Sequence, residues 1–284
     1  MKIIKYFFEF IIILFFFFIF KVFGLRLSSY ISGKIVRFIG PLFRSKEMIK
    51  SNINKALPDI KLKEKEEIIN SMWTSYGNIL SEYMFLRQLR SSKKILIEGE
   101  NIIEEIKNNN EPVIFISGHF SNFELMAMMI DKFGINLAAL YRPLNNFFLN
   151  FIMEYLRKKY ICKNQIKKGM TGLRELLTYF KNKHSIALMI DQRVTEGVKS
   201  NFFNQKAFTT TIPAQFVKKF GCKIVPVYIE RKNSLDFKIT FSRPISFGKD
   251  ETIEKITDDL NYLLEKMILR NPGQWIWSHN RWKL

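Results

Sequence analysis

The stretch that decides the fold is VIFISGHFSNFELMAMMI, residues 113–130. Its first part, Val113–Ser117, is apolar and runs into a Ser-Gly pair, which predicts a buried strand ending in a sharp turn. Ser121 or Asn122 can then serve as the N-cap of a following helix. This order places His119 beyond the carboxyl end of a strand, where open α/β sheets usually hold their chemistry.

Glu124 follows His119 with four residues between them. A turn between the two would let the Glu124 carboxylate fold back onto the imidazole. A carboxylate on Nδ1–H would fix the tautomer and leave Nε2 free as a general base. A plainer interpretation is a capping box, Ser121-x-x-Glu124, in which Glu124 only satisfies a backbone N–H. Spacing alone leaves both interpretations open.

Strands and helices alternate from Ile95 onward. The predicted strands are Val113–Ser117, Leu137–Tyr141, Ser185–Ile190, Lys223–Glu230 and Phe237–Phe241, and the predicted helices are Asn122–Phe133, Phe147–Lys159, Thr171–Lys181, Pro213–Phe220 and Glu251–Leu269. The alternation indicates an α/β fold with a mainly parallel sheet flanked by helices, and with an antiparallel edge late in the chain. The glycines form no phosphate-binding loop, so no nucleotide cofactor is expected.

The N-terminal sequence is strongly apolar. Phe10–Phe20 has no charged residue, and the wider stretch Ile3–Leu25 has only three. As a helix the wider stretch could cross or nearly cross a bilayer. No Ala-x-Ala-like cleavage site follows, which favours an uncleaved inner-membrane anchor over residues 1–25, either single-pass or monotopic. Basic residues on both sides leave its orientation open.

The rest of the chain divides into two parts. Residues 26–95 are predicted to be a mainly helical segment that packs on the α/β domain at 96–284. Within that segment, helical spacing of apolar residues predicts helices over Glu47–Leu57 and Lys63–Leu89.

The chain has 45 Lys and Arg against 26 Asp and Glu, a net charge of +19, which predicts anionic partners. No nucleic-acid-binding motif accompanies this charge, and most aromatic residues are Phe in apolar segments. An anionic membrane surface explains the charge at least as well as nucleic acid. Cys162 and Cys222 form no Cys-x-x-Cys pattern, so neither a metal site nor a thiol nucleophile is expected.

The segment GHFSNFEL resembles the His-x4-Glu motif of the late acyltransferases of lipid A biosynthesis, the lauroyl and myristoyl transferase family. The resemblance spans roughly residues 45–284 and continues through Tyr141-Arg142-Pro143, Asp191-Gln192, NFFNQKAFTT at 201–210 and NPGQWIWSHNRWKL at 271–284. Asn204 stands where the family usually has Gly. Asn tolerates a positive φ better than most residues, so we expect the turn to survive.

The resemblance implies a glycerolipid acyltransferase-like fold and an O-acyltransferase without metal or cofactor. The donor would be acyl-acyl carrier protein, and the acceptor a hydroxyl of a phosphorylated lipid A precursor. The catalytic domain would face the cytoplasm at the inner membrane, and nucleic acid would not be a partner. His119 would be the general base, with Glu124 as its catalytic partner.

Four further residues are candidate substrate ligands: Arg142, Arg157, Asp191 and Gln192. Arg142 follows a predicted strand and could clamp a phosphate or steady an oxyanion. Arg157 ends a predicted helix, where a cation also complements the helix dipole. Asp191 could position His119 from the opposite side, bind acceptor hydroxyls, or only cap a loop.

Two alternative functions stay open at this point. The chain could acylate a phospholipid or a phosphoinositol mannoside, although glycerophosphate enzymes usually carry His-x4-Asp. It could instead be a non-catalytic basic protein that binds anionic lipid. Trp275, Trp277 and Trp282 lie in a basic C-terminal tail, which favours a second membrane contact and packing in the core about equally.

Overall fold

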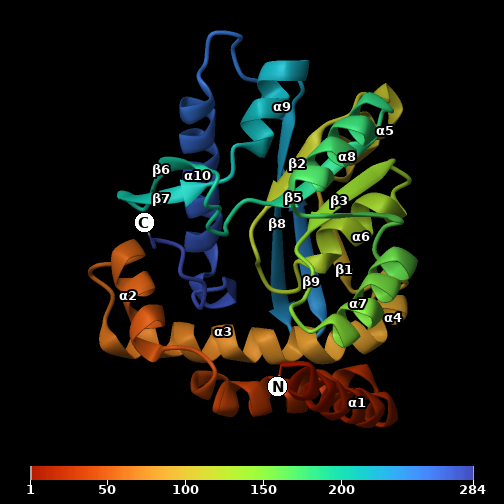
Figure 1. Ribbon diagram of the computed structural model, residues 1–284, viewed down its shortest axis with the longest axis vertical. Coiled ribbons are helices and arrows are strands. Elements are labelled where there is room, and N and C mark those ends of the chain that lie inside the picture. Colours follow the sequence, from red (N-terminus) through yellow and green to blue (C-terminus); the bar gives the residue numbers. More distant parts are fainter. Residues whose placement is uncertain (1, 284) are drawn as a thin grey trace.

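The computed structural model describes residues 2–283, which form a helical base beneath an α/β domain (Figure 1). The base begins with α1, Lys2–Ile39, which is broken at Gly24 (φ 72°). A 3-10 turn (η1) and four further elements follow it before the sheet starts: α2, α3, η2 and α4 span Lys46–Ala56, Leu62–Glu82, Tyr83–Phe85 and Leu86–Arg90. Residues 26–90 thus lie mainly in helices, and the division of the chain at residues 25 and 95 stays a prediction.

Helices α1 and α3 lie side by side along the base (Figure 1). Gly77 of α3 permits this close approach, because a Cβ at this position would lie 2.2 Å from the backbone oxygen of Ser32 on α1. The Ser32 hydroxyl in turn donates to the Gly77 carbonyl at 2.6 Å. The two helices are therefore joined by direct backbone contact, which a larger residue at 77 would prevent.

α1 together with η1, Lys2–Leu42, is the one helix within residues 2–283 that is long and apolar enough to cross a membrane. Its most apolar window has a mean hydropathy of 2.5, yet only 11% of that window is buried against the rest of the protein. Phe17 and Phe20 are among the few side chains before the break at Gly24 that pack into the core. Most of the apolar surface of α1 thus has no protein partner.

The main sheet has seven strands in the order β1-β9-β8-β2-β5-β3-β4. Every neighbouring pair is parallel except β8 and β9. In chain order the strands are β1 Ile95–Glu98, β2 Ile114–Ser117, β3 Leu137–Tyr141, β4 Asn164–Lys167, β5 Ser185–Met189, β8 Ile224–Asn233 and β9 Asp236–Phe241. The predicted fold class, a mainly parallel mixed sheet flanked by helices, is confirmed.

The position of the antiparallel pair differs from the prediction. β8 and β9 were expected to form an edge, but β1 pairs parallel with β9 and takes the edge position. β1 and β4 were not predicted at all. Each has only four residues, too few to show a clear period of two.

Helices cover both faces of the sheet (Figure 1). Phe115 on β2 packs in one core with α5, α6 and α7, while its neighbours Ile114 and Ile116 pack in the other with α8, α9 and α10. This alternation is what a central strand buried on both faces requires. The helices are α5 Glu100–Asn109, α6 Glu124–Lys132, α7 Phe147–Tyr160, α8 Met170–Lys181, α9 Ile212–Phe220 and α10 Ile253–Arg270.

A small hairpin of β6, Val198–Phe202, and β7, Gln205–Thr209, packs against α10. Its two turn residues, Phe203 and Asn204, both have positive φ, at 51° and 56°. The expectation that Asn204 adopts the conformation usually given to Gly is therefore confirmed.

The C-terminal tail packs in the core rather than against a membrane. Trp275, Trp277 and Trp282 are all buried. Each indole also has a polar partner inside the protein: Trp277 donates to the Pro272 carbonyl at 2.7 Å and Trp282 to the Phe202 carbonyl at 3.1 Å. Of the two interpretations of this tail, the membrane contact is wrong.

Candidate active site

His119 lies in the turn just after β2, and its closest polar partner is Asp191. The ring Nδ1 of His119 is 2.7 Å from Asp191 Oδ1, and the backbone N–H of His119 donates to Oδ2 at 2.7 Å. The register of the parallel strands explains the meeting. β2 and β5 pair Ser117 with Met189, so positions two residues further along each strand come together at the same edge.

Asp191 is buried and held by three donors. Burial alone would raise its pKa, but the His119 ring, the His119 backbone N–H and the Trp275 indole N–H outweigh burial and lower the pKa to about 2. Asp191 is therefore ionised at neutral pH. An ionised carboxylate on Nδ1 holds the proton of neutral His119 at that nitrogen and leaves the Nε2 lone pair available.

Gln192 follows Asp191 and connects two histidines. Its side-chain Nε2 is 3.2 Å from His119 Nε2 and 3.0 Å from His279 Nε2. Burial and the neighbouring His119 ring lower the pKa of His279 to about 4, so His279 is neutral near pH 7. The Nε2 atoms of His119 and His279 can then each accept a hydrogen bond from the side-chain NH₂ group of Gln192. His279 was quoted in the C-terminal motif but was not predicted as a site residue.

Glu124 begins α6, as expected, but it does not bond to His119. Its Oε1 accepts from Arg157 Nε at 2.9 Å, from Arg157 Nη2 at 2.5 Å and from the Tyr83 hydroxyl. Burial would lower the pKa of Arg157, but the Glu124 carboxylate raises it above its ordinary value. The predicted Glu124–His119 contact is thus replaced by a buried ion pair, because Arg157 on α7 captures the carboxylate.

The capping box is also absent. Ser121 has a φ of 45°, and its backbone N–H donates to the Gln274 carbonyl at 2.9 Å. Its hydroxyl is buried with no hydrogen-bond partner among the described residues, and Phe123 precedes α6 without a side-chain cap. Neither Ser121 nor Asn122 is the N-cap that the sequence predicted. The loop is fixed by tertiary contacts instead.

One of these contacts is a buried cluster that the sequence did not reveal. Glu82, at the end of α3, pairs with Arg231 on β8 through two contacts of 2.8 and 2.9 Å. The same carboxylate accepts from Asn122 at 2.8 Å and from Ser29 on α1 at 3.0 Å. Glu82 and Tyr83 lie in the segment MWTSYGNILSEY. The only local signal of the cluster is an acidic residue at the end of an apolar helix. The cluster connects α1, α3 and β8 to the loop after His119.

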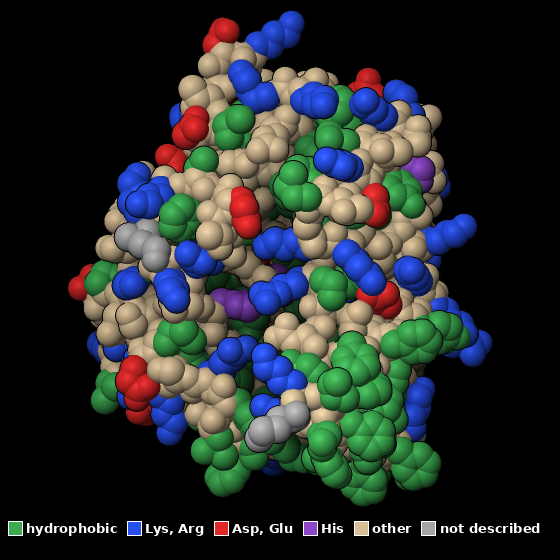
Figure 2. All heavy atoms as spheres, viewed as in Figure 1, with side chains coloured by type: hydrophobic (Ala, Val, Ile, Leu, Met, Phe, Trp, Pro, Cys, Tyr) green, Lys and Arg blue, Asp and Glu red, His purple; other side chains and the backbone are tan. Residues whose placement is uncertain are grey.

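A cleft of about 580 Å³ opens beside His119. It brings together Glu124, Arg142, Arg157 and Gln192 from the predicted set, and adds Arg44, Lys168 and His279. Asp191 does not line the cleft but lies behind the His119 ring. Figure 2 shows histidine side chains inside this hollow with Lys and Arg gathered around its rim.

Three of the cations around the cleft have no acidic partner. Within residues 2–283, Arg44, Arg142 and Lys168 form no ion pair. Burial and the charge of Arg142 lower the pKa of Lys168, which is the expected effect of neighbouring like charges. The cleft is therefore positively charged, with the His119–Asp191 pair at its side.

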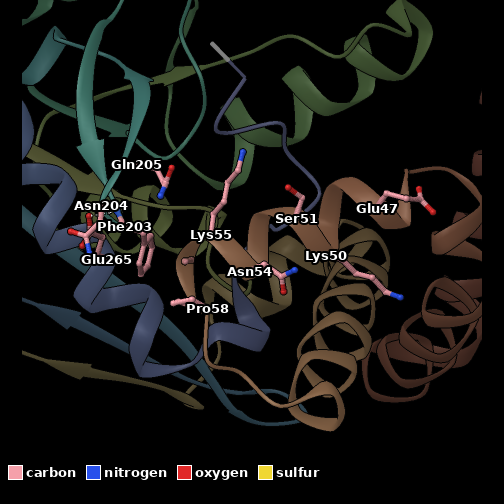
Figure 3. A pocket seen from close by; sticks show the side chains of 11 residues that line it. Glu47, Lys50, Ser51, Asn54, Lys55, Pro58, Phe203, Asn204, Gln205 and Glu265 are labelled. Carbon is pink, nitrogen blue, oxygen red and sulfur yellow. Dashed lines mark hydrogen bonds between the residues drawn. The ribbon is translucent and has the colours of Figure 1, made fainter.

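A second hollow of about 620 Å³ lies between α2 and the β6–β7 turn (Figure 3). Glu47, Lys50, Lys55 and Glu265 mix both signs of charge along it, and Figure 3 shows these side chains spread over its wall rather than converging. It shares no residue with the cleft beside His119. Its described lining side chains do not meet at a common point, so this hollow is not a candidate active site.

Comparison with known proteins decides the family. Residues 1–284 match the family model described as bacterial lipid A biosynthesis acyltransferase. The chain belongs to this family.

This acyltransferase is similar in sequence to several curated members. It is 23% identical over 261 residues to the lipid A biosynthesis palmitoleoyltransferase of Escherichia coli, covering 89% of this chain and 84% of the relative. It is 26% identical over 263 residues to lipid A biosynthesis acyltransferase 1 of Shigella flexneri, covering 87% and 78%. A 1-acyl-sn-glycerophosphate acyltransferase from Thermotoga maritima superimposes with a TM-score of 0.43 at 12% identity, covering 89% of this acyltransferase and 100% of that chain.

Proposed function

We propose that this protein transfers a fatty acyl chain from an acyl-acyl carrier protein thioester to a hydroxyl of a phosphorylated lipid A precursor, with His119 as the general base. The observation that carries the proposal is the His119–Asp191 pair, 2.7 Å apart, at the side of a positively charged cleft. Membership of the lipid A acyltransferase family supports the choice of acceptor.

The reaction needs one proton acceptor. His119 Nε2 takes the proton of the acceptor hydroxyl as its oxygen attacks the thioester carbonyl. A new C–O bond forms, the tetrahedral intermediate collapses, and the C–S bond breaks. The proton on His119 then passes to the departing thiolate, so that ester and free thiol leave a regenerated neutral base.

Asp191 and Gln192 prepare His119 for this step. Asp191 fixes the tautomer through Nδ1 and stabilises the imidazolium that forms. In the free enzyme the side-chain amide nitrogen of Gln192 lies 3.2 Å from His119 Nε2. The acceptor hydroxyl takes the place of this amide when it binds. Asp191 is thus proposed as a positioning residue rather than as a ligand of acceptor hydroxyls.

The unpaired cations supply the affinity for a phosphorylated substrate. Arg142, Lys168 and Arg44 line the cleft, and none of the three forms an ion pair within residues 2–283. Guanidinium groups bind phosphate bidentately, and a cluster of cations also attracts an acidic carrier protein. Arg157 keeps one nitrogen, Nη1, without a partner among the described residues, although its charge is neutralised by Glu124.

Direct transfer requires no acylated side chain. Burial raises the pKa of both Cys162 and Cys222 to about 12, so neither is a thiolate at neutral pH. Ser117 and Ser121, the two serines nearest to His119 in sequence, are both buried. These environments support attack by the acceptor hydroxyl itself.

We propose further that residues 1–25 anchor the enzyme in the inner membrane. The break at Gly24 separates the most apolar half of α1 from the half that packs along α3, and the α/β domain at 96–284 then lies on the cytoplasmic face with the soluble donor. A phospholipid or phosphoinositol mannoside acceptor remains the alternative within the same chemistry. A non-catalytic lipid-binding role gives no reason for a buried aspartate behind a cleft histidine.

The test compares His119→Ala with His184→Ala in the full-length enzyme. His184 is one of the three histidines, and its ring contacts the Asn182 carbonyl at 3.0 Å and the Tyr179 ring. Thiol release from acyl carrier thioesters is measured with a lipid A precursor, a lysophospholipid and a phosphoinositol mannoside as acceptors. We expect a loss on the order of 10²–10⁴-fold for His119→Ala and no loss for the control. A loss below about tenfold for His119→Ala overturns the general-base role.

A further inference from the structure

A stripe of aromatic side chains runs along the outer face of α7. Phe147, Phe151 and Tyr155 are four residues apart, so they lie on one side of the helix. Their side chains are 52%, 79% and 56% exposed. Single exposed apolar residues are common, but three in line on one helix form a patch that usually marks an interaction surface.

This stripe is continuous with the apolar surface of α1. The rings of Phe7 and Phe10 on α1 lie 5.8 and 5.5 Å from the ring of Phe148 on α7, and Phe147 and Phe148 are 4.0 Å apart. Asn146, the N-cap of α7, also donates to the Tyr6 carbonyl at 2.8 Å. Figure 2 shows hydrophobic side chains gathered over the corner of the molecule where Figure 1 draws α1 and α7.

The stripe also leads to the cleft. Leu144, which is part of the cleft wall and 39% exposed, lies three residues before Phe147. At the other end of α7, Lys158 and Lys159 are exposed and form no ion pair within residues 2–283, and the Lys159 ammonium donates to the Tyr155 hydroxyl at 2.8 Å. An apolar face that ends in exposed lysines complements a bilayer with anionic headgroups, in which the rings insert and the ammonium groups meet phosphates.

We infer that α7 is a second membrane-inserting surface, with Phe147, Phe151 and Tyr155 lying in the headgroup and acyl boundary of an anionic bilayer. This inference rests on the proposed anchoring by α1 and extends it. It brings the rim of the cleft at Leu144 to the membrane surface, so an acceptor lipid can reach His119 without leaving the bilayer completely. The second membrane contact then comes from α7 and not from the buried tryptophan tail.

The test places a fluorescent label at single positions of the full-length protein. Cys162 and Cys222 are first replaced by Ala, and Phe151→Cys, Phe18→Cys and Tyr262→Cys are then labelled with an environment-sensitive dye. Phe18 on α1 and Tyr262 on α10 are 70% and 57% exposed, so they are matched controls for the proposed anchor and for solvent. The proteins are reconstituted in phosphatidylethanolamine–phosphatidylglycerol vesicles with brominated acyl chains.

We expect brominated lipid to quench the label at 151 roughly twofold or more, as at 18, and to leave the label at 262 unchanged. Quenching at 18 but not at 151 overturns the inference and leaves the anchor in place. Absence of quenching at 18 overturns the anchor as well. Shielding at 151 that rises with protein concentration in detergent identifies a contact between two copies of the chain, and also overturns the inference.

A kinetic arm tests the consequence for the substrate. Phe151→Asp is compared with Tyr262→Asp, using acceptor embedded in the same vesicles and acceptor dispersed in detergent. We expect Phe151→Asp to raise KM for the embedded acceptor roughly tenfold, with kcat unchanged and no effect in detergent. Equal KM values for the two variants on vesicles contradict a role of α7 in membrane access.

Discussion

Asp191 and Glu124 are two carboxylates beside the same cleft, each paired with a basic side chain, and they do different things. Asp191 follows β5 and pairs with an imidazole, whose charge changes when a proton moves. Glu124 begins α6 and pairs with the Arg157 guanidinium, which stays charged at any pH of interest. One pair can therefore take part in proton transfer, whereas the other holds a fixed charge distribution in the wall.

The comparison also shows why distance along the chain is a poor guide to partnership. Glu124 is five residues from His119, and Asp191 is 72 residues away. Two adjacent parallel strands bring the distant carboxylate to the ring, while the near one bonds to Arg157 of α7 and Tyr83 of η2. The predictions below test this division of roles, in order of expected size.

The largest effect is expected for Asp191→Asn. The amide removes the negative charge that stabilises imidazolium, and its NH₂ group, unlike a carboxylate oxygen, cannot accept a hydrogen bond from a His119 or Trp275 N–H group. Turnover should fall on the order of 10²–10⁴-fold, measured as thiol release with saturating acceptor. Glu124→Gln is the matched control. If the two variants lose equal turnover per folded molecule, the division between the carboxylates is wrong.

Glu124→Gln should act first on stability. It leaves the buried Arg157 charge without its partner, a change that typically costs about 3–5 kcal/mol of unfolding free energy. Removing both charges in Glu124→Gln/Arg157→Met should recover much of this loss, as measured by denaturant unfolding. A double variant that is stable yet inactive would instead assign these two residues a direct part in the reaction.

Trp275→Phe should have an effect of intermediate size, and should act through Asp191 but not through Glu124. It removes one hydrogen bond to an ionised carboxylate, worth about 1.5–3 kcal/mol, while keeping an aromatic ring in the core. Part of that loss should appear as lower turnover, roughly tenfold, because Asp191 holds His119 less firmly. The control is Trp277→Phe, whose indole donates to the Pro272 carbonyl instead. Equal losses of turnover in both variants would reduce Trp275 to a packing role.

The smallest effect concerns the pH dependence contributed by His279. Its pKa falls from 6.5 to about 4 on folding, so below pH 6.5 the unfolded chain binds a proton that the folded protein does not. Stability from this group is fully present above pH 6.5 and is lost as the pH falls toward 4. His279→Gln should remove a slope of at most one proton over this range in pH-dependent thermal unfolding. An unchanged slope would show that another group is responsible.

The chain order and local pattern alone were sufficient for much of the fold. The apolar run before Gly118, the alternation of strands and helices and the apolar N-terminus each reflect a periodicity or length that tertiary contacts did not alter. They led to the α/β class and the place of His119 after a strand, whereas the positive φ at Asn204 was expected from the resemblance to a family that usually has Gly there. Short edge strands such as β1 carry too little pattern to be found in this way.

Tertiary structure decided the partners of each polar group. The pairing of β2 with β5 brought Asp191 to His119, and the fold placed Arg157 of α7 2.5 Å from the carboxylate of Glu124 on α6. Burial of the C-terminal tail brought the Trp275 indole N–H to Asp191, to which it donates a hydrogen bond. None of these contacts is local, and a hydrogen bond or ion pair depends on distances of a few ångströms. Those distances are fixed only when distant segments fold against one another.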